Sequence, residues 1–319
     1  GAGRWSAIQV PTMSFYEYCE LLNVDRPNLP DDLKITPLVY KTQQERTQIM
    51  LQLSKVHNYF NRYLQVGGFP ELALADNDIL AQQIMREDVV DKVLKRDLPS
   101  LYKIRNATEL ERIFLYLCNV SSEIVSIEAI AKELSGVSRP TVENYIQYLE
   151  SANLIYQSWP VNIGGKKILK ARPKIYIADA AIRNAVLMDD SLLSDPVEMG
   201  KIVETAVYKH VAAFYYQQAT SVGYYRGGSH GKEIDIVVEY STARDILIEV
   251  KYREEAPIPD DAAIVELSGD AAASIVVTKN ANDFGVHHTK SGKDLIRIPA
   301  FAFLYLLGHA EKHGYRGVE

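Results

Sequence analysis

Hydrophobic and polar positions alternate along two short segments of the chain, residues 232–240 and residues 246–251. In both segments an isoleucine or a valine stands at most of the alternate positions, and charged residues occupy several positions between them. A period of two is typical of half-buried β-strands. Residues 241–244 supply a short turn, so we predict an antiparallel hairpin. The hairpin would bring Asp235 and Glu249 onto a shared surface.

Apolar residues recur at helical spacing through the first hundred positions. Residues 43–64 are predicted to form a helix that stops at the glycine pair 67–68, and a second helix is predicted over about 78–94. Ser14 is followed three residues later by Glu17, which is the pattern of a capping box at the start of another helix. The beginning of the chain is therefore expected to be mainly helical.

Three further helices with short connections are predicted over residues 109–119, 127–134 and 139–150. The last two have the order of a helix-turn-helix, with the third helix in the place of a recognition helix. Two strand-like segments, 154–159 and 167–177, follow around a glycine pair and indicate a hairpin. This order predicts a winged helix-turn-helix.

The formal net charge of -6 means that a nucleic-acid partner would need a local basic patch. Residues 161–177 hold five basic and no acidic side chains, a composition suited to phosphate contacts. The basic residues are Lys166, Lys167, Lys170, Arg172 and Lys174, and we expect the first four, together with Arg139 and Asn144 of the third helix, to contact DNA. Winged helices also serve as protein–protein modules and lysine runs are often only solvated surface, so DNA contact and a structural or interaction role both stay open.

The last part of the chain has the element order of an α/β sandwich. A helix is predicted over residues 200–216, with Glu204 near its start. A strand over 221–226 precedes the acidic hairpin, and another follows over 274–278. The resulting order is helix, three strands, helix and strand.

In this context Glu204, Asp235 and the strand motif Glu249-x-Lys251 resemble the core of PD-(D/E)XK nuclease-like domains, over roughly residues 200–278. The resemblance implies that Asp235 and Glu249 bind Mg²⁺ or Mn²⁺, with Glu204 completing the metal shell. It also implies that Asp235, Glu249 and Lys251 are catalytic in phosphodiester hydrolysis, Lys251 orienting the attacking water or stabilising the transition state. The alternative is a solvated cross-strand cluster of charges, which is common on the open face of a hairpin.

The wider chain resembles uncharacterised prokaryotic AAA-type ATP-binding proteins, in which an ATPase domain precedes a winged helix and this nuclease-like domain. The matching pieces are Gly3-Arg4, Ser14-Phe15 with Glu17, Gly67 to Glu71, Arg96-Asp97, Ser138 to Thr141 with Tyr145 and Leu149-Glu150, Pro173 to Tyr176 with Asp179, and the two acidic strand motifs. No G-x-x-x-x-G-K-[ST] motif occurs, so we expect this chain not to bind ATP. The strand-like segment 8–10 has no preceding element to pair with, which suggests a fragment.

The predicted fold class is therefore α+β multidomain: a helical segment, a winged helix-turn-helix, and an α/β restriction-endonuclease-like (PD-(D/E)XK) domain. Residues 1–40 are interpreted as the remnant of the end of an AAA-type ATPase domain. A helical linker region over 41–100, a winged-helix domain over 101–190 and the nuclease-like domain over 195–319 are expected to follow.

Cysteine content and the search for targeting signals bear on the expected location of the protein and on the kinds of site it can hold. The two cysteines, Cys19 and Cys118, are far apart and argue against a disulfide framework or a zinc site. No apolar run approaches the roughly 20 residues of a membrane helix and no signal segment is evident, so a cytoplasmic location without membrane contact is expected. The function predicted is that of a DNA-associated protein with a Mg²⁺- or Mn²⁺-dependent nuclease-like domain, belonging to a larger ATPase. The alternative is a catalytically inactive DNA-binding or protein-interaction module of such an ATPase, and a protein partner or self-association is the other partner class.

Overall fold

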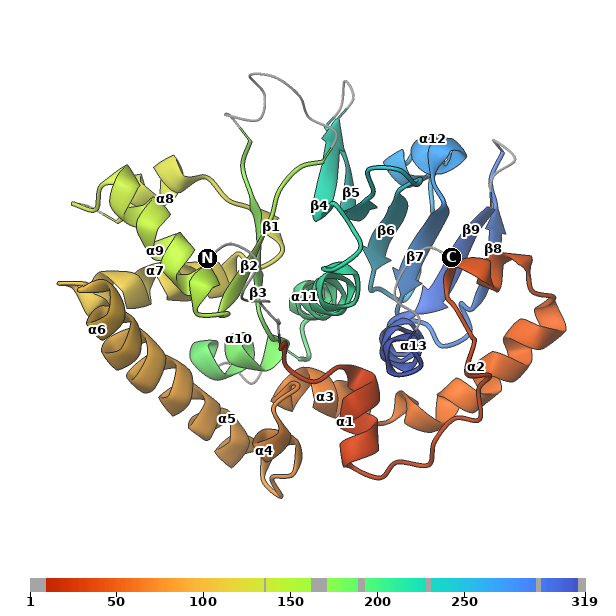
Figure 1. Cartoon of the computed structure of the whole chain (residues 1–319), viewed down its shortest axis with the longest axis horizontal. Helices are drawn as coiled ribbons and strands as arrows, with labels where there is room; N and C mark the ends of the chain where they lie inside the picture. Colours follow the sequence, from red (N-terminus) through yellow and green to blue (C-terminus); the bar gives the residue numbers. More distant parts are fainter. Residues whose placement is uncertain are drawn as a thin grey trace, which may run out of the picture.

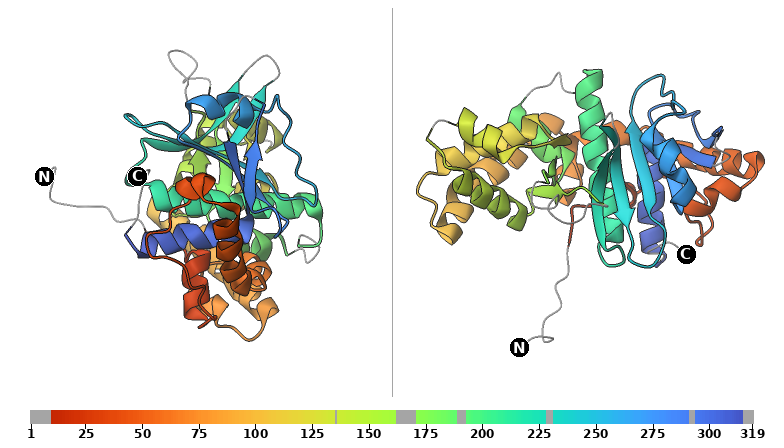
Figure 2. Two further views of the ribbon diagram at one scale, coloured as in Figure 1. Left: turned by 90° about the vertical axis from the view of Figure 1, so that its right-hand side faces the viewer. Right: turned by 90° about the horizontal axis from the view of Figure 1, so that it is seen from above.

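The computed structural model describes residues 10–134, 136–161, 171–188, 193–227, 231–290 and 294–314. They form an α+β fold with a helical N-terminal part and a mixed sheet in the C-terminal part (Figure 1). Helices of the N-terminal part lie at both ends of the long axis, and α11 stands between the small sheet and the large one (Figures 1 and 2). No helix of the described ranges has both the length and the apolar character needed to cross a membrane.

Helices occupy most of the chain before residue 152. They are α1 (Phe15–Leu21), the 3-10 helix η1 (Thr36–Tyr40), α2 (Gln43–His57), α3 (Phe60–Val66), α4 (Pro70–Ala73), α5 (Asp78–Arg86), the π-helical η2 (Glu87–Asp97), α6 (Leu98–Tyr102), α7 (Ala107–Asn119), α8 (Ile127–Glu133) and α9 (Arg139–Ser151). The capping box predicted at Ser14 and Glu17 is confirmed. A second capping box, Thr42 with Glu45, begins α2.

Two predicted helices differ from the observed ones. The helix expected over 43–64 is divided at Asn58 and Tyr59, because α2 packs against α13 while α3 packs against α10. The helix expected over 78–94 continues without a break through η2 into α6, which contains Pro99.

The small sheet has the strand order β1-β3-β2, and β3 is antiparallel to both neighbours. Its strands are β1 (Glu123–Ile124), β2 (Ile155–Ser158) and β3 (Lys174–Ile177), and α10 (Ala180–Leu187) follows directly. The tip of the predicted hairpin, including Lys166, Lys167 and Lys170, lies outside the described residues.

The large sheet has the order β4-β5-β6-β7-β9-β8. Its elements are α11 (Pro196–Tyr215), β4 (Ser221–Gly227), β5 (Lys232–Glu239), β6 (Ile246–Lys251), α12 (Ala263–Leu267), η4 (Ser268–Asp270), β7 (Ala273–Thr278), β8 (Gly285–His288), β9 (Asp294–Pro299) and α13 (Ala300–Lys312). The predicted β5–β6 hairpin is confirmed as antiparallel, with Ile236 opposite Ile248. β7 is parallel to both β6 and β9. The two strands β8 and β9 and the helix α13 were not predicted from the sequence.

The two faces of the large sheet are covered by different helices. α11 and α13 pack on one face, and α12 packs on the other against β5 and β6 (Figure 1). The N-terminal helices α1 and α2 lie against α13, so one buried hydrophobic cluster extends from Phe15 to Ala310. This core is continuous across residues 40, 100 and 190, and the domain divisions at those positions stay predictions.

Candidate functional site

The residues predicted to form a nuclease-like site lie on two inner strands of the large sheet and on the helix α11. Glu204 comes from α11, Asp235 from β5, and Glu249 and Lys251 from β6. The ammonium of Lys251 lies 2.5 Å from Glu249 Oε1. The backbone N–H of Val250 donates to Asp235 Oδ2 at 2.8 Å, which fixes that carboxylate against the neighbouring strand. The hairpin therefore orients Asp235 through its own backbone, and Glu249 through the Lys251 side chain.

A further lysine, Lys174 of β3, lies among these carboxylates. Its Nζ is 2.9 Å from Glu204 Oε1, 2.9 Å from Glu233 Oε1 and 3.2 Å from Asp235 Oδ1. Only 4% of its side chain is exposed. We call Glu204, Glu233, Asp235 and Glu249, with Lys174 and Lys251, the acid cluster. Glu233 was not among the residues predicted to form the site.

The sequence prediction that Lys174 belongs to an exposed basic hairpin is therefore wrong. Because side chains alternate along a strand, Lys174 and Tyr176 share one face of β3, and this face lies against α11. The Tyr176 ring stacks on Tyr208 of α11, with ring centroids 4.0 Å apart, and its hydroxyl donates to Glu204 Oε1 at 2.9 Å. Pattern alone gives the two faces of β3, but not what lies opposite each of them.

Burial changes the proton affinity of the acid cluster. Burial and the neighbouring Asp235 raise the pKa of Glu204 to about 7, although Lys174 and Tyr176 act in the opposite direction. The same two causes raise the pKa of Glu249 to about 7 against the effect of Lys251. Glu249 Oε2 is buried and accepts no hydrogen bond. Four carboxylates here face two ammonium groups, so the acid cluster has an excess of negative charge when it is fully ionised.

The predicted metal ligands can be compared with what a divalent cation requires. Carboxylate oxygens are the ligands that Mg²⁺ and Mn²⁺ prefer, and the unpartnered Glu249 Oε2 offers one more. Oxygen donors from Asp235 and Glu249 therefore fit such an ion chemically. In the described parts of the chain, however, only Asp31, His309 and His313 place three candidate ligand atoms within 4.8 Å of one another.

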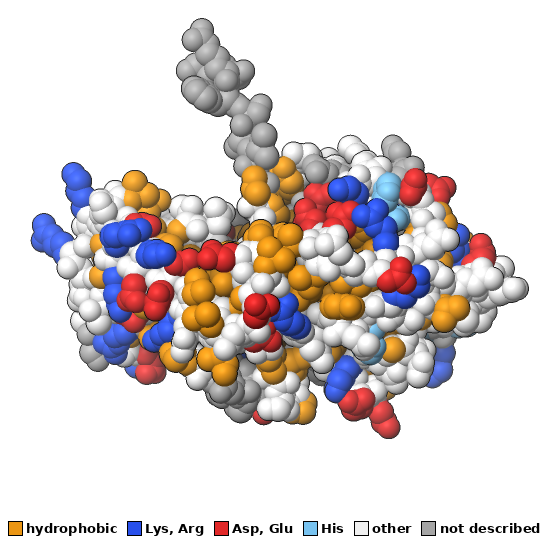
Figure 3. Space-filling model, turned by 90° about the horizontal axis from the view of Figure 1, so that it is seen from below, with side chains coloured by type: hydrophobic (Ala, Val, Ile, Leu, Met, Phe, Trp, Pro, Cys, Tyr) orange, Lys and Arg blue, Asp and Glu red, His pale blue; other side chains and the backbone are white. Residues whose placement is uncertain are grey.

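The predicted DNA contacts are distributed differently. Arg139 and Asn144 are exposed on α9, and Arg172 is exposed before β3. The guanidinium of Arg139 makes ion pairs with Glu128 at 2.9 Å and Glu143 at 2.8 Å, so its charge is largely balanced locally. On the face of the molecule seen in Figure 3, the basic side chains that are drawn are interspersed with acidic ones.

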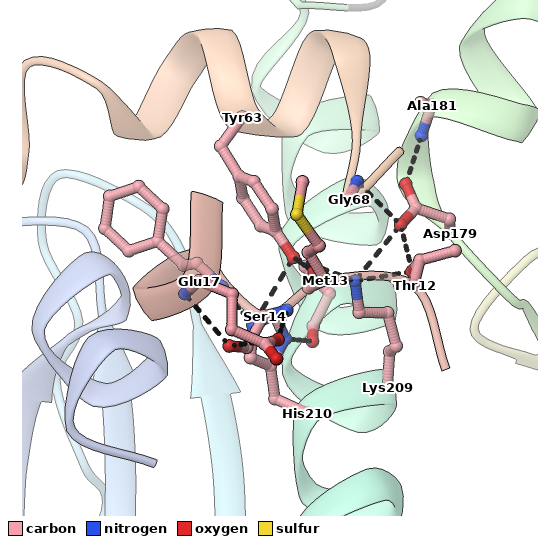
Figure 4. A network of polar contacts seen from close by, with 12 residues as sticks. Thr12, Met13, Ser14, Glu17, Tyr63, Gly68, Asp179, Ala181, Lys209 and His210 are labelled. Atoms are coloured by element: carbon pink, nitrogen blue, oxygen red, sulfur yellow. Dashed lines mark hydrogen bonds and ion pairs between the residues drawn. The ribbon is translucent and has the colours of Figure 1, made fainter. Parts of the chain in front are cut away.

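A second polar cluster, which we call the Asp179 network, lies between the N-terminal segment and α11 (Figure 4). Lys209 Nζ lies 3.1 Å from Asp179 Oδ2 and donates to Thr12 Oγ1 at 2.8 Å and to the Tyr63 hydroxyl at 2.8 Å. Asp179 also accepts from Thr12 Oγ1 at 2.6 Å and from the backbone N–H of Gly68 at 3.1 Å. Both charged side chains are 3% exposed, so this is a buried ion pair with additional hydrogen bonds.

His210 completes the Asp179 network in its neutral form. Its Nδ1 lies 2.7 Å from the carbonyl oxygen of Ala206, and its Nε2 accepts from the backbone N–H of Phe15 at 2.9 Å. These partners assign the proton to Nδ1. Burial and the adjacent Lys209 charge lower the pKa of His210 to about 3. The network thus attaches the start of α1 to α11, and through Asp179 to α10.

Several sequence pieces that carried the family resemblance meet in these two clusters. Lys174 and Tyr176 enter the acid cluster, while Gly68 and Asp179 enter the network. The short motifs contain residues of both clusters, but the residues that they contact are far away in sequence. Lys174 and Asp235, for example, are 61 positions apart. Sequence reasoning gave Asp179 no role.

The fold and the site together define an α+β protein with a buried, lysine-bridged acid cluster. Comparison with known proteins adds two domains of unknown function: residues 57–193 match DUF8612, and residues 199–301 match DUF4143. Residues 204–251, which contain most of the acid cluster, fall within the second match.

The relatives that match are themselves described as uncharacterized proteins. MJ1544 of Methanocaldococcus jannaschii is 24% identical over 261 residues, covering 79% of this chain and 56% of the relative. A protein of Haemophilus influenzae is 25% identical over a region that covers 48% of this chain and 38% of the relative. Rv2008c of Mycobacterium tuberculosis is 29% identical over a region that covers 55% of this chain and 39% of the relative. The matched region thus spans about half or less of these relatives. No solved structure matches the chain.

Proposed function

We propose that this chain is a DNA-associated protein that acts with an AAA-type ATPase and carries a Mg²⁺- or Mn²⁺-dependent site for phosphodiester hydrolysis. The observation that carries the proposal is the convergence of Glu204, Asp235, Glu249 and Lys251 from three elements. The match to DUF4143, a domain found in AAA-ATPase-associated proteins, supports the association with an ATPase.

The element order supports a PD-(D/E)XK assignment for this part of the chain. The helix α11 precedes the antiparallel strands β4, β5 and β6, and β7 then pairs in parallel with β6. Asp235 and Glu249 would hold the cation, with Glu204 beside them. The cation would lower the pKa of an attacking water and offset charge on the scissile phosphate. Lys251, next to Glu249, would orient that water or stabilise the transition state.

The small sheet supports a role in bringing DNA to the site. The order α8, α9, β2 and β3 is the order expected of a winged helix, in which α9 would be the recognition helix. We propose that the contacts to DNA are made by Arg139, Asn144, Lys166, Lys167, Lys170 and Arg172. These contacts would be sequence-independent in so far as they are made to phosphates.

Cleavage assays of the full chain test the proposal. We expect cutting of single-stranded, double-stranded or branched DNA with Mn²⁺ or Mg²⁺, and a loss of roughly 10²-fold or more in rate for Lys251→Ala. The matched control is Lys290→Ala, which removes a lysine that is 85% exposed and paired with Asp260 outside the acid cluster. Absence of cutting on all three substrates with both metals would refute hydrolysis.

Binding is tested separately from cleavage. DNA affinity should fall as the salt concentration rises. Combining Lys166→Ala and Lys167→Ala should weaken binding at low salt and make it less dependent on salt, because each lost phosphate contact reduces the salt slope by about 0.9. Binding that does not depend on salt would contradict a contact to phosphates.

The second candidate function is a non-cleaving DNA-binding or protein-interaction module of the ATPase. It is favoured by the position of Lys174, whose ammonium already neutralises two of the three predicted metal ligands, Glu204 and Asp235. Salt-dependent DNA binding without cutting would select the DNA-binding form of this candidate. Absence of DNA binding, together with a protein partner that co-purifies in stoichiometric amount, would select the interaction form.

A further inference from the structure

Lys174 differs from an ordinary surface lysine in the number and burial of its partners. Its ammonium contacts three carboxylates from two elements, Glu204 on α11 and both Glu233 and Asp235 on β5. Surface ion pairs of lysine are usually exposed and weak. Here the lysine side chain is 4% exposed, and the Glu204 and Asp235 side chains are 15% and 16% exposed. The contacts therefore form a built site for a cation.

The backbone around Lys174 holds the ammonium in this position. β3 is the central strand of the small sheet and pairs with β1 and β2 on its two sides. Two residues along the same strand, Tyr176 stacks on Tyr208 and donates to Glu204. The same carboxylate thus receives both Lys174 and Tyr176. These contacts restrict the movement of β3 relative to α11.

The two lysines of the acid cluster have different surroundings. Lys251 makes its ion pair with Glu249, and 32% of its side chain is exposed. Lys174 lies between the acids, and its oxygen partners Glu204 Oε1 and Asp235 Oδ1 belong to residues that the proposed function assigns to the metal. A divalent cation bound through those oxygens would be close to the ammonium. Two cations at that separation repel each other, most strongly where water is excluded.

We propose that Lys174 is the resident counter-cation of the acid cluster, and that a divalent cation binds there only in competition with it. This inference rests on the metal site of the proposed function and adds a residue that regulates it. Lys174 and the metal are then two ligands of one site with negative coupling. Withdrawal of Lys174 from the carboxylates should therefore strengthen metal binding. Because coupling is reciprocal, bound metal should weaken the Lys174 contacts by the same factor.

The inference predicts opposite effects of one substitution with and without metal. Lys174→Met removes the charge and leaves Glu204, Glu233 and Asp235 without their shared partner, so the protein without metal should melt at a lower temperature than wild type. Mn²⁺ should then restore the melting temperature, because an ion that binds only the folded state stabilises it. Wild-type protein should respond much less to the same Mn²⁺ concentration.

The experiment is a calorimetric titration of the full chain with Mn²⁺, together with thermal melting in EDTA and in Mn²⁺. We expect Lys174→Met to bind Mn²⁺ about 5- to 150-fold more tightly than wild type, the usual range of such coupling. Adding Asp235→Asn to Lys174→Met should abolish the gain. Lys201→Met is the matched control, because Lys201 also bridges two glutamates, Glu123 and Glu198, outside the acid cluster.

A second variant covers the case in which Lys174→Met does not fold. Lys174→Gln keeps hydrogen-bond donors for the carboxylates but removes the charge, and it should show the same direction of change in Mn²⁺ affinity. Equal Mn²⁺ affinity in wild type and in the folded Lys174 variant would overturn the inference and leave the proposed function standing. Tighter Mn²⁺ binding in the variant, without cleavage by any form, would support the inference and refute hydrolysis. Failure of every form to bind Mn²⁺ would overturn both.

Discussion

Replacing Asp179 with asparagine removes one charge from the Asp179 network while keeping the shape of the side chain. The carboxylate accepts from Thr12, Gly68 and Lys209 through Oδ2 and from the backbone N–H of Ala181 through Oδ1. An asparagine can place its oxygen toward only one of these two directions. The NH2 group of the asparagine would then face the hydrogen-bond donors on the other side. The ammonium of Lys209 would be left buried without a counter-charge.

The magnitude follows from the burial of the pair. Removing one partner of a buried ion pair costs about 3–5 kcal/mol, because the remaining charge is not compensated. Typical domains are stable by about 5–15 kcal/mol, so Asp179→Asn should remove a large share of the free energy of unfolding. The low pKa of Asp179 has the same origin: burial raises it, but Lys209 and the hydrogen bonds from Thr12, Ala181 and Gly68 outweigh burial.

Urea unfolding followed by circular dichroism measures the loss. The matched control is Asp25→Asn, because Asp25 pairs with Lys55 at 2.9 Å but is 80% exposed. That change should cost no more than about 1 kcal/mol. Similar losses for Asp179→Asn and Asp25→Asn would refute the view that burial makes the Asp179–Lys209 pair important. In a double-mutant cycle with Lys209→Met, the two losses should also be non-additive by about 0.5–3 kcal/mol.

Two further predictions concern the same region. Wild-type stability should fall as the pH drops below 6.5, because folded His210 has a pKa of about 3 and takes up its proton less readily than unfolded histidine. His210→Gln should reduce that slope, and an unchanged slope of stability against pH would contradict this. Gly136→Ala should lower the free energy of unfolding by about 1–2 kcal/mol, and Gly67→Ala should lower it by more. Both glycines have positive φ, but only at Gly67 would a Cβ meet Asp179 Oδ1, at 2.3 Å, and equal losses in urea unfolding would argue against that clash.

Local pattern was sufficient to predict much of the fold. The alternation around Asp235 and Glu249 predicted the β5–β6 hairpin, and the capping pattern at Ser14 predicted the start of α1. Both depend on interactions between near neighbours. β8 and β9 were missed because both strands are short, so their hydrophobic alternation is too brief to be recognised. β9 is also held by parallel pairing with β7, which is a tertiary contact. The sequence placed Glu204, Asp235 and Glu249 on the correct elements for the same local reasons.

The role of Lys174 could not be predicted in this way. Its neighbours in sequence are basic, so composition assigned it to a phosphate-binding surface, whereas its partners come from α11 and β5. Period-two alternation fixes which residues of β3 share a face, but tertiary packing decides whether that face meets solvent or three carboxylates. The same limit applies to Asp179, whose partner Lys209 is 30 positions away.

Both polar clusters hold the same two parts of the chain together. On one side Lys174 begins β3 and Asp179 follows that strand five residues later, and on the other Glu204 and Lys209 lie less than two turns apart on α11. The acid cluster therefore stabilises the junction whether or not it catalyses a reaction. A loss of DNA cleavage in a Glu204 variant would indicate catalysis only if the free energy of unfolding is retained. Substitution of Lys251, whose contact lies within β6, separates chemistry from this junction more cleanly.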